Sequence, residues 1–242
     1  MVSNCKRLSA VDRNANRIHA VNDLIQTMRR LLPALLSAAL VSCGVPKATT
    51  HHLVDVDTLS RPPRLDVRYA TKANFTHQRL YPRAKVFLHR DAAQALAAVQ
   101  ADLAQDGLRL KVFDGYRPLS VQQRMWDLIR DERYVSNPAV NRGRHTRGTA
   151  VDVTLVDSSG RDLPMGTDYD DFSEKAHPDF AGLPERVKRN RAKLAAAMTR
   201  HGFEAYPYEW WHFDLKDWKR YPVLDVGIDA LAAGEARAVP VR

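Results

Sequence analysis

The stretch GRHTRGTAVD (residues 143–152) places a histidine on a glycine-flanked loop that leads into a β-strand. Successive strand residues point to opposite faces, so Val151, Val153 and Leu155 share one face and Asp152 lies on the other. The aliphatic face predicts a buried core. A carboxylate in the middle of such a strand is unfavourable unless a cation or a metal ion pairs with it. We therefore expect Asp152 either to form an ordinary ion pair with a basic side chain or to bind a metal.

A second segment, YPYEWWHFD (residues 206–214), carries Glu209 three residues before His212. Pro207 and the aromatic residues favour a turn into a strand over a helix. Because positions three apart in a regular strand face opposite ways, Glu209 can approach His212 only from a bend before the strand. A histidine beside two tryptophans is most simply a hydrogen-bonded core residue, and metal binding is the alternative.

The remaining sequence alternates between helical and strand patterns without an internal repeat or a second linker, which predicts one α+β domain. Apolar residues at helical spacing, with capping residues at the ends, predict three helices at about 91–105, 120–134 and 184–201. Period-two alternation predicts five strands at about 53–57, 108–113, 149–156, 203–206 and 211–215.

The composition is that of a globular protein of 242 residues, with 45% apolar and 27% charged residues. The net charge is +9, of which the first 42 residues contribute +4 through six basic and two acidic side chains. The remaining excess is modest and scattered, so we expect no nucleic-acid partner. No run of 18 uninterrupted apolar residues occurs, which excludes a multi-span membrane protein.

The first 42 residues have the features of an export leader. Arg29 and Arg30 precede an apolar run over residues 31–41, and LVSCG (residues 40–44) resembles a bacterial lipobox whose cysteine is lipidated. We expect translation to start near Met28, with a lipoprotein leader over 1–42 and a linker over 43–62 after lipidated Cys43. The mature protein would then be exported and anchored to a bacterial membrane, facing the periplasm or the cell exterior. An uncleaved apolar N-terminal helix is the alternative.

The only other cysteine is Cys5, so a chain cut before Cys43 forms no internal disulfide. A metal in such a chain must be held by nitrogen and oxygen ligands.

Four groups of residues together resemble the zinc-dependent D-alanyl-D-alanine dipeptidases, which have a hedgehog-like D,D-peptidase fold. They are RYAT with NFT (68–71 and 74–76), DGYRP (114–118), the His145 to Asp152 stretch, and EWWH (209–212). The resemblance spans about residues 53–225. It implies a central antiparallel sheet with helices packed on it, and a zinc D,D-dipeptidase domain over 63–242. One departure is Gly143, which stands where the family usually has a serine.

The same resemblance implies one Zn²⁺ ion per chain, held by His145, Asp152 and His212. Two neutral imidazoles and one carboxylate leave a zinc ion with a free position, at which the pKa of a water molecule falls to about 7. Glu209 corresponds to the catalytic acid and base. Arg117 corresponds to a group that stabilises the transition state, although it could instead pair structurally with an acid such as Asp114.

The resemblance further assigns Asp170 to the substrate's ammonium group, although this acidic segment could simply be a solvated loop. We expect hydrolysis of D-Ala-D-Ala or a close D,D-dipeptide of cell-wall metabolism. One alternative is a zinc D,D- or L,D-carboxypeptidase that acts on longer wall peptides. Another is a non-catalytic, zinc-containing module that binds wall peptides.

Overall fold

The strand that carries Asp152 is the central strand of a five-stranded sheet. In the computed structural model, which describes residues 52–234, this strand is β5 (Ala150–Val156), and all seven of its residues are buried. The sheet order is β2 (Arg64–Leu65), β4 (Arg109–Asp114), β5, β7 (His212–Leu215) and β6 (Phe203–Ala205). The predicted leader, the start at Met28, Cys43 and the linker up to residue 51 lie outside the described residues.

The predicted α+β class is confirmed, and four of the five strands pair antiparallel. The edge strand β2 pairs parallel with β4, which makes the sheet mixed. A two-residue strand has no detectable alternation, so β2 could not be predicted. The predicted strand at 53–57 is shorter, β1 (Leu53–Asp55), and it pairs with the unpredicted β3 (Phe87–His89) in a separate two-stranded sheet.

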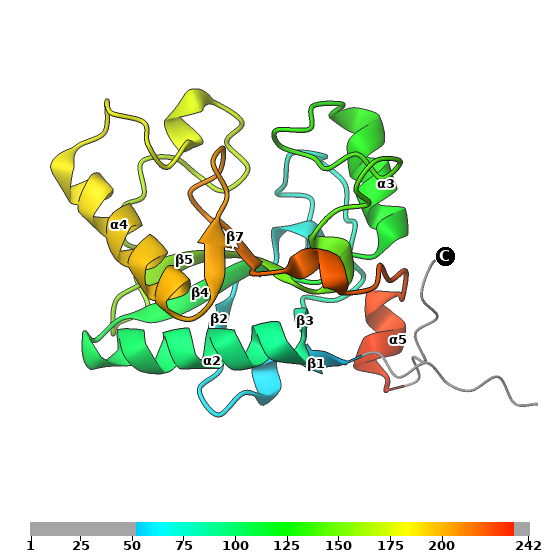
Figure 1. Cartoon of the computed structure of the whole chain (residues 1–242), viewed down its shortest axis with the longest axis horizontal. Helices are drawn as coiled ribbons and strands as arrows, with labels where there is room; N and C mark the ends of the chain where they lie inside the picture. Colours follow the sequence, from blue (N-terminus) through cyan, green and yellow to red (C-terminus); the bar gives the residue numbers. More distant parts are fainter. Residues whose placement is uncertain (1–51, 235–242) are drawn as a thin grey trace, which may run out of the picture. The chain divides into compact units, whose positions relative to one another are not determined.

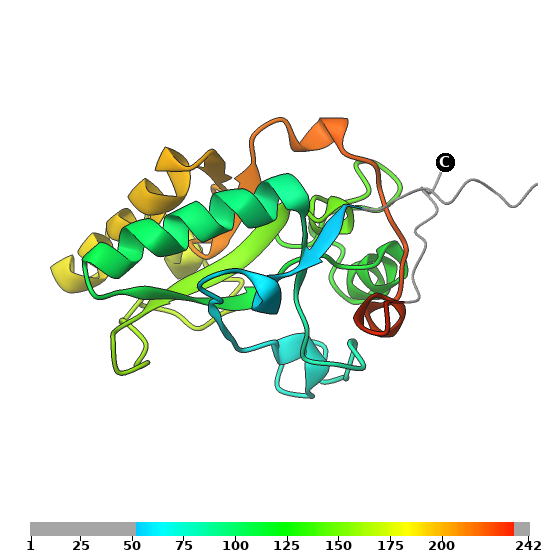
Figure 2. The same cartoon turned by 90° about the horizontal axis from the view of Figure 1, so that it is seen from below.

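Two 16-residue helices supply the apolar layer that covers the sheet (Figures 1 and 2). Helix α2 (Arg90–Gln105) contacts β4, whereas α4 (Glu185–Arg200) contacts β5 and β6, and the two helices pack against each other. Both match the predicted helices closely. The buried stripe of α2 consists mainly of Ala92, Ala93, Leu96, Val99 and Leu103.

Helix α3 (Leu119–Leu128) ends six residues before the predicted end. The side chain of Asp131 accepts a hydrogen bond from the backbone N–H of Arg133, and this local turn competes with helix continuation. A short helix α5 (Ile228–Ala232) was not predicted. Single 3-10 turns lie at Val56–Thr58, Arg68–Ala70, His145–Arg147, Glu174–Ala176 and Trp218–Arg220. Among residues 52–234, none of the helices is both long and apolar enough to cross a membrane.

Candidate metal centre

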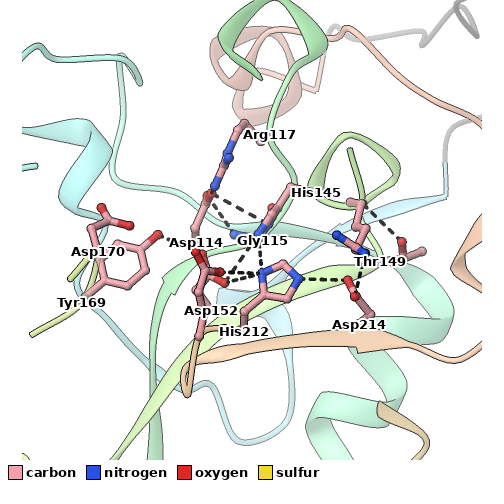
Figure 3. A network of polar contacts seen from close by, with 12 residues as sticks. Asp114, Gly115, Arg117, His145, Thr149, Asp152, Tyr169, Asp170, His212 and Asp214 are labelled. Atoms are coloured by element: carbon pink, nitrogen blue, oxygen red, sulfur yellow. Dashed lines mark hydrogen bonds and ion pairs between the residues drawn. The ribbon is translucent and has the colours of Figure 1, made fainter. Parts of the chain in front are cut away.

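The pairing of β5 with β7 brings the two sequence segments together. In this antiparallel register Asp152 lies directly opposite His212, so both side chains project from the same face of the sheet. His145 lies on the 3-10 turn before β5, and its Nδ1 is 2.7 Å from the carbonyl oxygen of Gly115. That contact leaves Nε2 of His145 facing Asp152 and His212 (Figure 3).

The three donor atoms have the spacing that a zinc ion requires. Nε2 of His145 lies 3.2 Å from Nδ1 of His212, and Oδ1 of Asp152 lies 3.5 Å and 3.0 Å from these two nitrogens. Ligands about 2.1 Å from a tetrahedral zinc ion are about 3.4 Å from one another. The three side chains are at most 7% exposed. Their geometry and their N, N, O chemistry therefore fit a divalent metal.

Asp152 provides an independent sign that the site suits a cation. Its Oδ2 accepts a hydrogen bond from the Tyr169 hydroxyl at 2.8 Å, whereas its buried Oδ1 has no hydrogen-bond donor within the described part of the chain. Nδ1 of His212 lies 3.0 Å from this oxygen, but the contact does not have the geometry of a hydrogen bond. Burial would lower the pKa of His212, but Asp214 and Asp152 overcome it and raise that pKa to about 10. The site thus stabilises positive charge.

Glu209 lies on the turn before β7, as the sequence predicted. Its Oε2 is 3.7 Å from Nδ1 of His212, and the carboxylate is not part of the three-residue metal group. Burial raises the pKa of Glu209 well above its ordinary value. A carboxyl group in this position is near enough to exchange a proton with a molecule at the metal and is suited to doing so.

Arg117 is buried and lines the same cavity, where all three nitrogens of its guanidinium group donate hydrogen bonds. Its Nε and one terminal nitrogen donate to Oδ2 of Asp114 at 3.0 and 2.8 Å, and the other terminal nitrogen donates to Gln122. Burial opposes the positive charge, yet Asp114 raises the pKa of Arg117 well above its ordinary value. The structural pair with Asp114 therefore exists, and it also holds a permanent cation at the cavity wall.

Asp170 lies at another wall of the cavity, in a left-handed backbone conformation with φ of 62°. Both its carboxylate oxygens are 3.1 Å from the hydroxyl of Tyr69, which lies 3.2 Å from the hydroxyl of Tyr169. Desolvation and the charge of Asp152 raise the pKa of Asp170 well above its usual range. The left-handed backbone and the contacts with Tyr69 fix the position of the Asp170 carboxyl group at the cavity wall.

Sequence reasoning missed two residues of this site. Tyr169 binds the metal-site carboxylate, and Asp214 accepts a hydrogen bond from Nε2 of His212 at 3.0 Å. A signal existed for Asp214, because it lies two residues after His212 and residues two apart in a strand share a face.

The departure from the family pattern at Gly143 has a backbone explanation, since its φ of 82° favours glycine.

The metal group, Glu209, Arg117 and Asp170 line one cavity that is open to solvent. A sequence profile of the peptidase family described as D-Ala-D-Ala dipeptidase matches residues 49–225. The chain belongs to this family. The resemblance drawn from the sequence motifs is therefore confirmed, and family membership together with the His-Asp-His group makes this dipeptidase homologue a zinc metallopeptidase.

The family's curated members are similar to the chain over most of their length. The D-alanyl-D-alanine dipeptidase of Escherichia coli (strain K12) is 37% identical over 175 residues, covering 72% of this chain and 90% of that protein. The D-alanyl-D-alanine dipeptidase of Enterococcus faecium is 29% identical over 187 residues, covering 69% and 92%. Among solved structures, the vancomycin-resistance D,D-dipeptidase VanXYg in complex with a D-Ala-D-Ala phosphinate analogue matches with a TM-score of 0.35 and 20% identity, covering 62% of this chain and 56% of that one.

Proposed function

We propose that the chain hydrolyses D-alanyl-D-alanine, or a closely related D,D-dipeptide of cell-wall metabolism, to free D-amino acids. The observation that carries this proposal is the grouping of the metal site, Glu209, Arg117 and Asp170 around a single cavity. A free dipeptide has an ammonium group, a scissile carbonyl and a carboxylate. The cavity offers a carboxylate for the first and a metal site with a fixed cation for the second.

The metal ion would be held by His145, Asp152 and His212, one ion per chain. When bound, zinc supplies Lewis acidity that polarises the scissile carbonyl and lowers the pKa of a water molecule. Glu209 accepts the proton of the attacking water as the new C–O bond forms. The carbonyl oxygen then gains negative charge, and Arg117 stabilises that charge from the cavity wall.

Collapse of this tetrahedral species breaks the C–N bond. Glu209 returns its proton to the departing nitrogen, which leaves as the amine of the second amino acid, while the first leaves as a carboxylic acid. Asp170 binds the ammonium group of the substrate and so positions the scissile bond. An N-acylated peptide has no such ammonium, which favours a dipeptidase over a carboxypeptidase.

Turnover of the free dipeptide, compared with that of a wall pentapeptide, tests the proposal. We expect the zinc-loaded protein to cleave D-Ala-D-Ala, to lose activity on chelation and to regain it with zinc. Preferred cleavage of the pentapeptide would instead indicate a D,D- or L,D-carboxypeptidase. Zinc binding without cleavage of either peptide would indicate a binding module.

We also propose that the mature protein begins at lipidated Cys43 and is anchored at a bacterial membrane, facing the periplasm or the cell exterior. The lipobox-like LVSCG and the preceding apolar run support this proposal. More than one acyl chain would be needed for durable anchoring, because a single chain binds membranes only marginally. Intact mass of the protein from its native host tests it, since retention of Met1 with an unmodified Cys43 would contradict the proposed processing.

A further inference from the structure

The two histidines of the metal site are supported differently at the ring nitrogen that faces away from the metal. Nδ1 of His145 lies 2.7 Å from a neutral backbone carbonyl, that of Gly115. Nε2 of His212 lies 3.0 Å from Oδ1 of Asp214, a side chain that is only 8% exposed. Figure 3 shows Asp214 on the opposite side of the His212 ring from Asp152.

The other carboxylate oxygen of Asp214 pairs with a cation. Oδ2 of Asp214 lies 2.8 Å from Nε of Arg144, the residue before His145. The Arg144 guanidinium lies between two aromatic rings, 4.7 Å from the centroid of Tyr206 and 5.1 Å from that of Trp218. These contacts restrict the position of Arg144 and thereby fix the carboxylate that it pairs with.

These contacts determine which nitrogen of His212 carries the proton. Because Oδ2 of Asp214 is paired with the guanidinium of Arg144, its Oδ1 accepts the hydrogen bond and Nε2 of His212 donates it. In the neutral imidazole the lone pair then lies on Nδ1, the nitrogen that faces Asp152 and His145. A carboxylate partner also makes the metal-facing nitrogen more basic than a carbonyl partner does.

We propose that Asp214, with Arg144 as its counter-ion, is the positioning residue of the metal centre: it orients His212 and sets its tautomer, and thereby raises the affinity for zinc. This inference adds a supporting pair behind the predicted ligand and depends on the proposed metal site, though not on the substrate. Asp214 thus links His212 to Arg144, and both of these residues line the cavity.

The test measures zinc affinity directly, by competition with a chromophoric chelator, in the folded chain. We expect Asp214→Asn to weaken zinc binding about 10-fold and Asp214→Ala up to about 100-fold, the range found when such supporting partners are removed. Arg144→Gln should cause a smaller loss of the same kind. Cobalt substitution adds a spectroscopic readout, since a reoriented imidazole alters the visible absorption of the bound ion.

A matched control separates positioning from simple destabilisation. Asp225 accepts hydrogen bonds from the backbone and side chain of Ser120 at the start of α3, and it is not among the residues that line the cavity. Asp225→Asn should lower the free energy of unfolding without changing the zinc dissociation constant.

Zinc binding within twofold of wild type in folded Asp214→Asn and Asp214→Ala would overturn the proposal. If the alanine variant does not fold, the isosteric asparagine variant decides alone. Loss of dipeptide hydrolysis in all variants with unchanged zinc affinity would also refute it, while leaving the proposed function intact.

Discussion

Replacing Glu209 with glutamine separates metal binding from proton transfer. Glutamine has the same shape and fits the same buried position, but it cannot accept the proton of the attacking water. A well-placed general acid and base contributes about 10²- to 10⁴-fold, which at about 1.36 kcal/mol per factor of ten is roughly 2.7–5.4 kcal/mol of activation free energy. We expect kcat for D-Ala-D-Ala to fall by that factor.

Zinc content should remain close to that of the wild type in Glu209→Gln. The carboxylate lies 3.7 Å from Nδ1 of His212 and is not one of the three donors of the metal group. Stability should change little, because the buried carboxyl is replaced by a neutral group of equal size. Steady-state kinetics and metal analysis on the same preparation measure both effects, with Glu204→Gln on the exposed side of β6 as the control. A zinc-loaded Glu209→Gln enzyme that retains more than a tenth of the wild-type kcat would refute the assignment.

Three further substitutions test the site and its scaffold. His145→Ala should lose both zinc and hydrolysis, and a variant that keeps stoichiometric zinc would exclude His145 as a ligand. Arg191→Met should destabilise the fold by about 3–5 kcal/mol in urea denaturation, because the buried guanidinium donates to three backbone carbonyls; a loss under 1 kcal/mol would contradict this. Gly148→Ala should cost at least about 2 kcal/mol in the same assay, since φ is +68° and the new methyl would lie 2.8 Å from the backbone nitrogen of His89; an unchanged midpoint would show that the loop adapts.

The elements that the sequence predicts well are those with long periodic patterns. The alternation around Asp152 identified β5 and the face on which the carboxylate lies, and the apolar stripe that includes Leu96 identified α2. The position of Glu209 on a bend followed from Pro207 and the aromatic residues together with the period of two residues. In β5 and α2 the apolar pattern repeats often enough to favour one type of secondary structure over the other.

What could not be predicted depends on contacts between distant segments. Helix α3 ends where Ile129 takes an extended conformation, before the turn at Asp131, and β2 exists only because β4 provides a partner. The Arg191 side chain looks like part of the basic outer face of α4, yet it reaches three carbonyls of the segment 165–177 that also contains Asp170. No pattern within a single helix contains that information.

The register of three neighbouring strands explains how the carboxylate and the histidine of the metal site come together. Asp114 of β4 lies opposite Asp152 of β5, which lies opposite His212 of β7, so the three side chains form one row across the sheet. A slip of one residue in either pairing would turn a member of the row to the other face. An irregularity in β4 between Val112 and Asp114 brings the first carboxylate into this row, where Arg117 balances its charge. Backbone hydrogen bonding in the sheet therefore positions two metal-site residues, Asp152 and His212, and His145 on the turn before β5 completes the site.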